Sequence, residues 1–188
     1  MLKRIIPFAH ELLTRSVRVG DTVVDATCGN GNDTLLLCKL VGDSGHVYAV
    51  DIQQRAIDST KKLLSEHHYT NVTFIHDSHA KLDEYLPNDL KGKLGGAVFN
   101  LGYLPRSDKK IITKGDSTIR AIETLLEYIR EKALVVIVIY HGHEGGAEEK
   151  EAVLNYVQKL DQKKFAVLKY EFINQKNNPP FVVAIEKL

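Results

Sequence analysis

The chain has 188 residues, of which 44% are hydrophobic and 26% are charged. This composition fits a folded globular protein and excludes a disordered tail or a collagen-like rod. Twenty-five basic and 24 acidic side chains give a formal net charge of +1, which excludes a strongly basic, non-specific nucleic-acid binder but allows an enzyme with a local basic patch. The longest apolar run, residues 133–140, is far shorter than the roughly 20 residues that span a bilayer.

The cysteines and the N-terminal residues indicate the compartment. Cys28 and Cys38 are too few for a disulfide scaffold or a cysteine zinc site. Lys3 is followed by Pro7 and His10, which interrupt the apolar core that a signal peptide needs. We therefore expect a cytoplasmic protein with reduced thiols and no membrane contact.

In chain order, the sequence begins with a predicted amphipathic helix over residues 2–16, whose inner face includes Leu12 and Leu13. Short runs of β-branched and aromatic residues then alternate with segments of helical period. The apolar run at 133–139 does not alternate with polar residues, so we expect helices to cover both faces of that strand. The predicted strands are 22–26, 46–50, 72–75, 95–101, 133–139, 165–172 and 181–186, and the predicted helical faces lie within 56–64, 119–129 and 153–160.

This alternation of strands and helices predicts a doubly wound, mostly parallel sheet with right-handed crossovers. Only residues 173–180 connect the last two strands, too few for a crossover helix, so those strands must form an antiparallel hairpin. The expected fold class is therefore α/β and Rossmann-like: a seven-stranded, mostly parallel sheet with a C-terminal antiparallel hairpin and helices on both faces. We expect residues 1–188 to form a single domain, because no linker or repeat divides them.

A nucleotide-binding pattern occupies residues 23–33. A buried strand ends in Asp25, a tight turn with two glycines follows, and a helix begins near residues 32–33. Glycines let the backbone pass close to a ligand, and the helix start offers free amide hydrogens. The second strand leads into Asp51, which can accept hydrogen bonds from a ribose diol. The third leads into Asp77, which can meet the amino group of an adenine.

Two cofactors fit this pattern, and the residues separate them. A dinucleotide fingerprint requires a third glycine where this chain has Thr34, and the Asp25 carboxylate would face a pyrophosphate. A carboxylate suits instead the ammonium of S-adenosylmethionine, so we predict that cofactor rather than NAD. A turn that binds nothing is the alternative, and acids at three successive strand ends argue against it. The predicted cofactor-binding residues are Asp25, Thr27, Gly29, Asn30, Gly31, Asn32, Asp51, Gln53, Asp77, His79 and Asn100.

The fourth strand ends in a segment suited to a nitrogen nucleophile. Asn100 precedes a turn that contains Gly102 and Tyr103, and this end of a doubly wound sheet borders the ligand crevice. The Asn100 side-chain oxygen can accept hydrogen from an amine and so aim its lone pair at a sulfonium methyl, and Tyr103 can stack on a base. An ordinary turn with a tyrosine at the edge of the core is the alternative.

Two histidines and a glutamate crowd the end of the fifth strand, in residues 140–146. His141 and His143 lie two residues apart without a convincing third ligand, so we predict no metal site. We interpret His143 as a candidate catalytic group beside Asn100 and Tyr103. A histidine that is simply exposed in a loop is the alternative.

The remaining predictions concern the substrate. Residues 106–114 hold four basic side chains and one acidic side chain over the expected crevice, where they could contact RNA phosphates or simply be solvated. Residues 177–180 predict a turn within the terminal hairpin, whose place allows a role on the substrate side. The predicted substrate-binding residues are His10, Leu101, Gly102, Arg106, Lys109, Lys110, Tyr140 and His141.

Taken together, these residues resemble the class I S-adenosylmethionine-dependent methyltransferases, through D-A-T-C-G-N-G at 25–31 and the acids Asp51 and Asp77. More narrowly, the chain resembles the YtqB-like rRNA methylase group. It shares with that group A-H at 9–10, N-L-G-Y-L-P at 100–105, Y-x-G-H-x-G-G at 140–146 and N-Q-x-N-x-P-P at 174–180. These motifs extend over nearly the whole chain.

The resemblance implies a tRNA methyltransferase that acts on an anticodon stem–loop. Its reaction would convert 5-aminomethyl-2-thiouridine at the wobble position to 5-methylaminomethyl-2-thiouridine by N-methylation. Methylation of rRNA or of a small amine with the same cofactor is one alternative, and a non-catalytic nucleotide- or RNA-binding module is another. The sequence leaves a homodimer open.

Overall fold

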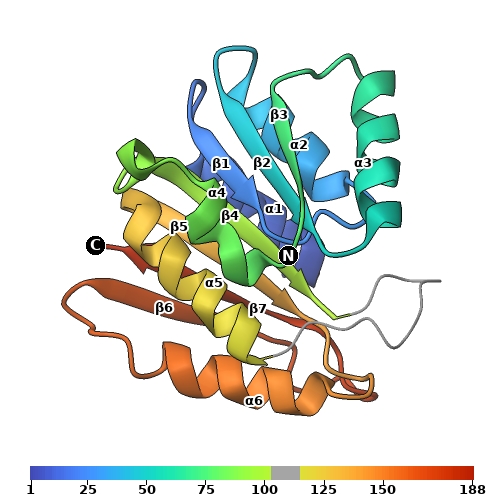
Figure 1. Ribbon diagram of the computed structural model, residues 1–188. Coiled ribbons are helices and arrows are strands. Elements are labelled where there is room, and N and C mark those ends of the chain that lie inside the picture. The colour runs from blue at the N-terminus through green and yellow to red at the C-terminus, as the bar shows by residue number, and fades with distance from the viewer. Residues whose placement is uncertain (103–114) are drawn as a thin grey trace.

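A seven-stranded sheet runs through the molecule in the order β3-β2-β1-β4-β5-β7-β6 (Figure 1). The computed structural model describes residues 1–102 and 115–188. The strands are β1 (Thr22–Asp25), β2 (His46–Asp51), β3 (Val72–His76), β4 (Leu94–Leu101), β5 (Ile129–Ile139), β6 (Phe165–Tyr170) and β7 (Phe181–Lys187). The first five pair in parallel, whereas β7 runs antiparallel to both β5 and β6. This arrangement confirms the predicted fold class and its C-terminal hairpin.

Helices cover both faces of the sheet. The described helices are α1 (Ile5–Ser16), α2 (Asn32–Val41), α3 (Gln54–Glu66), α4 (Leu82–Tyr85), α5 (Gly115–Tyr128) and α6 (Gly146–Val157), with 3-10 turns η1 (His79–Lys81) and η2 (Asn88–Leu90). Figure 1 shows α5 and α6 in front of the sheet and α1 and α2 behind it. Leu13 of α1 and Leu37 of α2 share a buried cluster with Val23, whereas Ile122 of α5 belongs to the opposite cluster with Val24. Neighbouring strand residues therefore bury opposite faces, as the unalternating apolar runs predict.

The first helix is shorter than predicted. It begins at Ile5 rather than at residue 2. Leu13 is fully buried, but Leu12 is only half-buried, because the buried stripe of α1 follows Ile5, Ala9 and Leu13 at a spacing of four residues.

Strand β5 begins earlier than predicted and contains a bulge. Leu94 pairs with Ile129 and Gly96 pairs with Leu134, so five steps along β5 match two steps along β4. Lys132 within the extra segment has a φ of 63°, a left-handed conformation that matches an interruption of regular pairing. The polar residues of this segment hide the start of the strand from a search for β-branched runs.

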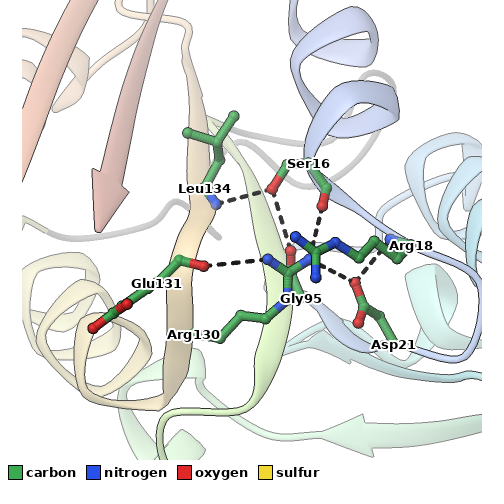
Figure 2. Close-up of polar contacts among 7 residues, drawn as sticks. All are labelled: Ser16, Arg18, Asp21, Gly95, Arg130, Glu131 and Leu134. Carbon is green, nitrogen blue, oxygen red and sulfur yellow. Dashed lines mark hydrogen bonds and ion pairs between the residues drawn. The ribbon is translucent and has the colours of Figure 1, made fainter. Parts of the chain in front are cut away.

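A polar cluster closes the amino edge of the sheet (Figure 2). The Arg130 guanidinium donates to the Ser16 carbonyl at 2.9 Å and to Asp21 Oδ2 at 3.0 Å. Ser16 Oγ donates to the Gly95 carbonyl at 3.3 Å and accepts from the Leu134 N–H at 3.2 Å. The cluster thus fastens the end of α1 to β4 and β5, on the edge opposite the carboxyl ends of the parallel strands.

The two cysteines are both buried and free. Burial raises the pKa of each thiol, that of Cys38 to about 11, so neither is an activated nucleophile. Within residues 1–102 and 115–188, no helix is both long and apolar enough to cross a membrane.

The order of the strands reverses between β1 and β4. In open α/β sheets, ligands bind in the crevice outside the carboxyl ends of the strands at such a switch point. The residues that follow β1, β2, β4 and β5 are therefore the place to look for a functional site.

Candidate active site

Asp25 lies beneath the turn that follows β1, and its side chain is fully buried. Its Oδ2 accepts a hydrogen bond from Thr34 Oγ1 at 2.6 Å, and its Oδ1 accepts one from the Thr27 N–H at 3.2 Å. Burial, followed by the negative charge of Asp33, raises the pKa of Asp25 to about 8. Asp25 thus ties the turn to the first turn of α2, and its direct contact with a cofactor ammonium stays a prediction.

Gly29 and Gly31 shape the turn itself. Their φ angles are 51° and 84°, in the left-handed region that favours glycine. A Cβ on Gly31 would lie 3.0 Å from Thr60 Cα, and Thr60 Oγ1 donates to the Gly29 carbonyl at 3.2 Å, so α3 packs directly against the turn. Asn30 and Asn32 are exposed at the start of α2, where free backbone N–H groups can meet a ligand.

Asp51 stands beside this turn at the end of β2. Its Oδ2 accepts from the Gly29 N–H at 3.0 Å and its Oδ1 from the Gln53 N–H at 3.0 Å. Burial is the largest influence on Asp51 and raises its pKa. A carboxylate offers about four acceptor positions, so acceptors remain for the hydroxyls of a ribose. The glycine turn, the helix start and this carboxylate together fit an adenosine cofactor such as S-adenosylmethionine.

Asp77 follows β3 and already has protein partners. Its Oδ2 accepts from Tyr85 Oη at 2.7 Å and from Lys81 Nζ at 3.1 Å, and its Oδ1 accepts from the Ser78 N–H at 2.7 Å. These contacts, that of Tyr85 first, lower the pKa of Asp77 to about 2. Asp77 is therefore a fixed anion near the third strand end, and its predicted contact with adenine stays a prediction.

His79 is buried below the crevice rather than exposed in it. Its Nδ1 lies 3.2 Å from the Ala26 carbonyl, and since a carbonyl only accepts, Nδ1 carries the hydrogen. Its Nε2 lies 3.5 Å from Thr118 Oγ1, which donates to Glu149 Oε1 at 2.8 Å. Burial lowers the pKa of His79 to about 4, so the ring is neutral and supports the backbone after β1 from below. Its predicted contact with the cofactor stays a prediction.

Asn100 is the centre of a network that joins three elements. Its backbone N–H donates to Thr27 Oγ1 at 2.6 Å, which ties the end of β4 to the turn after β1. Its side-chain Nδ2 donates to Asp33 Oδ2 in the first turn of α2. The other carboxylate oxygen of Asp33 lies 2.7 Å from His10 Nε2 of α1. An ionised carboxylate can only accept, so Asn100 Oδ1 is left to accept hydrogen from a substrate.

The residues after β5 form the opposite wall. The Tyr140 N–H donates to the Leu101 carbonyl at 3.0 Å, and a Cβ on Gly102 would lie 3.3 Å from Tyr140 Cβ and 3.4 Å from His143 Cε1. The Leu101 side chain is buried in the core, so only its backbone faces the crevice. Burial, followed by the charge of Asp33, raises the pKa of Tyr140, which keeps its hydroxyl protonated. Burial also lowers the pKa of His143, which favours a neutral ring.

The remaining predicted residues can be placed only in part. His141 follows Tyr140, and its Nε2 donates to the Pro179 carbonyl at 3.0 Å. Tyr103, Arg106, Lys109 and Lys110 lie outside the described residues, as does the predicted basic segment 106–114. In the part of the chain that is described, no three His, Cys, Asp or Glu side chains are grouped so as to hold a metal ion.

Asp33 is a site residue that the sequence analysis did not single out. In the sequence, an acid in the first turn of a helix is explained well enough by the helix dipole. Nothing in the spacing shows that His10 and Asn100 converge on it from 23 and 67 residues away. The A-H pair and the N-L-G-Y motif were the available signals, because each contributes one partner of Asp33.

Two family models match parts of this chain. The family model described as "Putative rRNA methylase" matches residues 47–186. A second model, described as "Protein-L-isoaspartate(D-aspartate) O-methyltransferase", matches residues 4–89, the part of the chain that holds the glycine turn, Asp51 and Asp77.

Three relatives cover nearly all of this chain. The "tRNA (mnm(5)s(2)U34)-methyltransferase, chloroplastic" of Arabidopsis thaliana is 36% identical over 194 residues, which include 98% of this chain and 70% of that protein. The structure of a "putative rRNA-methylase" from Clostridium thermocellum is 43% identical in sequence, with a TM-score of 0.95. The structure of a "putative methyltransferase" from Streptococcus mutans in complex with SAH is 39% identical, with a TM-score of 0.90. Each of the two matches covers 100% of this chain and 100% of the other chain. The chain therefore belongs to the rRNA methylase family and is a class I S-adenosylmethionine-dependent methyltransferase.

Proposed function

We propose that this enzyme methylates the primary amine of 5-aminomethyl-2-thiouridine at the wobble position of tRNA, within the anticodon stem–loop, and gives 5-methylaminomethyl-2-thiouridine. The observation that carries the proposal is the Asn100 amide, which Asp33 orients so that its oxygen can accept hydrogen from an amine. The name of the Arabidopsis relative, which aligns with 98% of this chain, supports the choice of nucleoside.

The amine must be neutral when it reacts, because an alkylammonium has no lone pair to donate. An N–H of the amine donating to Asn100 Oδ1 directs the nitrogen lone pair away from the asparagine. When bound, S-adenosylmethionine supplies an electrophilic methyl group on a sulfonium. Holding the nucleophile in line with that group is expected to supply most of the rate enhancement.

Methylation leaves a proton to be removed. Transfer of the methyl group to the amine would form an N–C bond as the C–S bond breaks and would leave a neutral thioether, so the new secondary ammonium would have one proton to lose. Asp33 Oδ1 and His10 Nε2 lie 2.7 Å apart, and the His10 side chain is 33% exposed. We expect this pair to accept the proton and pass it to solvent.

The test is a methylation assay with defined tRNA. The pure protein is incubated with S-adenosylmethionine and total tRNA that lacks the terminal wobble methylation. The tRNA is then digested, and the masses of its nucleosides are measured by mass spectrometry. The expected result is a gain of one methyl group on 5-aminomethyl-2-thiouridine.

Two other outcomes would overturn the proposal. Transfer of labelled methyl to rRNA or to a small amine, with none to the wobble nucleoside, would agree with the assigned cofactor but show that the substrate is a different one. Tight cofactor binding with no transfer to any RNA or amine would indicate a binding module instead.

A further inference from the structure

The turn between β6 and β7, residues 171–180, packs against the wall of the active site. Phe181, the first residue of β7, pairs with Ile139 at the end of β5, so the turn meets the segment that follows β5. There His141 Nε2 donates to the Pro179 carbonyl at 3.0 Å, and a Cβ on Gly142 would lie 3.6 Å from Asn178 Cβ. The hydrogen bond therefore fixes one end of the turn, where Gly142 and Asn178 also approach each other closely.

The same segment also touches the end of β4. Tyr140 donates its N–H to the Leu101 carbonyl at 3.0 Å, and Tyr140 and His143 lie within 3.4 Å of a Cβ built on Gly102. The turn, the residues after β5 and the end of β4 thus form one continuous surface. Asn100, which we expect to contact the nucleophile, lies at one end of it, and Asn178 lies at the other.

The amide side chains of the turn are exposed and uncommitted, whereas Glu171 pairs with Lys169 at 2.7 Å and Phe172 contacts the Tyr170 ring. Residues 173–178 are all exposed, Ile173 to 92%. The amides of Asn174, Gln175, Asn177 and Asn178 make no hydrogen bond with the described part of the chain. Asn177 and Asn178 are consecutive left-handed residues, with φ of 65° and 52°. Asparagine adopts this conformation readily, and two such residues in succession are typical of a tight turn, so this part of the loop has a defined shape.

Basic groups flank the turn. Lys176 is exposed within it. Tyr170, the last residue of β6, donates its hydroxyl to the Lys3 carbonyl at 2.7 Å and stacks on Phe8 at 3.9 Å between ring centroids. These contacts hold the N-terminal segment against the end of β6; its Arg4 is exposed, and its Lys3 is ion-paired with Glu11 at 2.8 Å. Cations at this position can meet phosphates on either side of a bound nucleotide.

We infer that the β6–β7 turn reads a base of single-stranded RNA next to the nucleotide that is methylated, and that His141 is a positioning residue that holds the turn through Pro179. Asparagine and glutamine place a donor and an acceptor side by side, which matches the edge of an unpaired base. Exposed, uncommitted amides on the surface that continues from Asn100 are suited to that contact. The inference rests on the proposed function, because it requires an RNA substrate.

The test uses the full chain and synthetic anticodon stem–loops that carry the target nucleoside and differ in the bases beside it. The double variant Asn174→Ala/Gln175→Ala removes two amides outside the left-handed positions. The control Lys163→Ala/Lys164→Ala removes two exposed cations at the start of β6, on the opposite edge of the sheet. Stem–loop binding is measured by fluorescence anisotropy, methylation by initial rates, and cofactor binding by calorimetry.

The wild type is expected to discriminate between these stem–loops. The double amide variant should bind the preferred stem–loop about 10-fold more weakly and lose most of the discrimination, with KM for RNA affected more than kcat and cofactor affinity unchanged. The lysine control should behave as the wild type. His141→Phe should resemble the amide variant, whereas His141→Gln, which keeps an N–H donor, should recover part of the discrimination.

Two results would overturn the inference, and they are distinguishable. An amide variant that binds and discriminates like a wild type active on these RNAs would refute the role of the turn and leave the proposed function intact. A wild type that neither binds nor methylates any stem–loop would refute the proposed function, and this inference with it.

Discussion

Asn100 and Asp33 are 67 residues apart in the sequence, yet the Asn100 amide nitrogen donates a hydrogen bond to Asp33 Oδ2. The same carboxylate is held by His10 from α1 at 2.7 Å. Since an ionised carboxylate accepts and cannot donate, it selects the amide orientation in which Nδ2 faces it. Asp33 therefore determines that Oδ1 of Asn100, rather than Nδ2, faces a nucleophile.

Replacing Asp33 with asparagine tests this relationship. The new amide can face Asn100 with either its oxygen or its nitrogen, so Asn100 loses its fixed orientation and the site loses an acceptor for the proton. We expect kcat for methyl transfer to fall by about 10- to 100-fold, with the Kd for S-adenosylmethionine changed by less than about threefold. The control is Asp43→Asn, an exposed aspartate just after α2. Unchanged kcat in Asp33→Asn would contradict the role assigned to Asp33.

The roles of Asp51 and Asn100 can be separated by a pair of alanine variants. Asp51 accepts two backbone hydrogen bonds, from Gly29 and Gln53, and we expect it to hold the cofactor. Asp51→Ala should raise the Kd for S-adenosylmethionine by about 10- to 100-fold, the scale of one or two hydrogen bonds to a charged group. Asn100→Ala should leave that Kd near the wild-type value and lower kcat. Calorimetry with initial rates checks both, and an equal loss of cofactor affinity in the two variants would refute the assignment.

Gly31→Ala isolates the close approach of the cofactor turn to α3. Gly31 and Gly92 both have left-handed φ angles, 84° and 72°, but a Cβ on Gly31 would lie 3.0 Å from Thr60 Cα, whereas one on Gly92 would meet nothing within 4 Å. Gly92→Ala should lower the free energy of unfolding by about 1 kcal/mol, because alanine is strained in the left-handed backbone conformation. Gly31→Ala should lower the free energy of unfolding, measured in urea, by more than Gly92→Ala does, and it should also weaken cofactor binding. Similar losses in both variants would show that the contact with α3 is unimportant.

The sequence predicts the framework of this site well, because each framework feature depends on local pattern. Parallel strands follow from the alternation of apolar runs with helices, and the terminal hairpin follows from the short 173–180 connection. Acids at successive strand ends meet at one edge of a parallel sheet whatever the details of packing. Asp51 beside the glycine turn is an example, with its contact to the Gly29 N–H at 3.0 Å.

The sequence does not predict contacts that depend on how distant elements pack. The convergence of His10 and Asn100 on Asp33 requires the placement of α1 against α2, which no periodicity encodes. The β5 bulge is similar, because Arg130 within it is bonded to Ser16 and Asp21, two residues that are distant in the sequence. His79 has a strand-end position in the sequence, but packing buries it below the crevice.

Arg130→Met tests whether the amino-edge cluster in Figure 2 stabilises the fold without touching the reaction. The variant keeps an apolar stem but leaves the Ser16 carbonyl and the Asp21 carboxylate without the guanidinium. The side chains of Arg130 and Asp21 are only 17% and 15% exposed. We expect the free energy of unfolding to fall by about 2–3 kcal/mol, with kcat and cofactor affinity unchanged. Arg120→Met is the control, because its ion pair with Asp83 is 3.5 Å long and 59% and 48% exposed, so it should cost less than about 1 kcal/mol. Equal losses would contradict the prediction.

His79 should make the fold sensitive to mild acid. Burial lowers its pKa from 6.5 to about 4, so below pH 6.5 the unfolded chain binds a proton that the folded chain does not. The stability that His79 contributes is therefore complete above pH 6.5 and is lost as the pH falls from 6.5 to about 4, by up to about 3 kcal/mol. Asp25 acts in the opposite direction, because its raised pKa of about 8 favours the folded state at low pH and that contribution is lost as the pH rises from 3.8 to about 8.

The two effects are separated by comparing variants rather than by the wild-type curve alone. His79→Gln can keep a donor to the Ala26 carbonyl but does not titrate, so it removes only the histidine contribution. Urea unfolding at several pH values should show the stability difference between wild type and His79→Gln shrinking or reversing as the pH falls from 6.5 to 4. His67→Gln, at an exposed position, is the control for the loss of an imidazole outside the core. A difference between wild type and His79→Gln that stays constant over this range would mean that the buried ring gains its proton without cost to the fold.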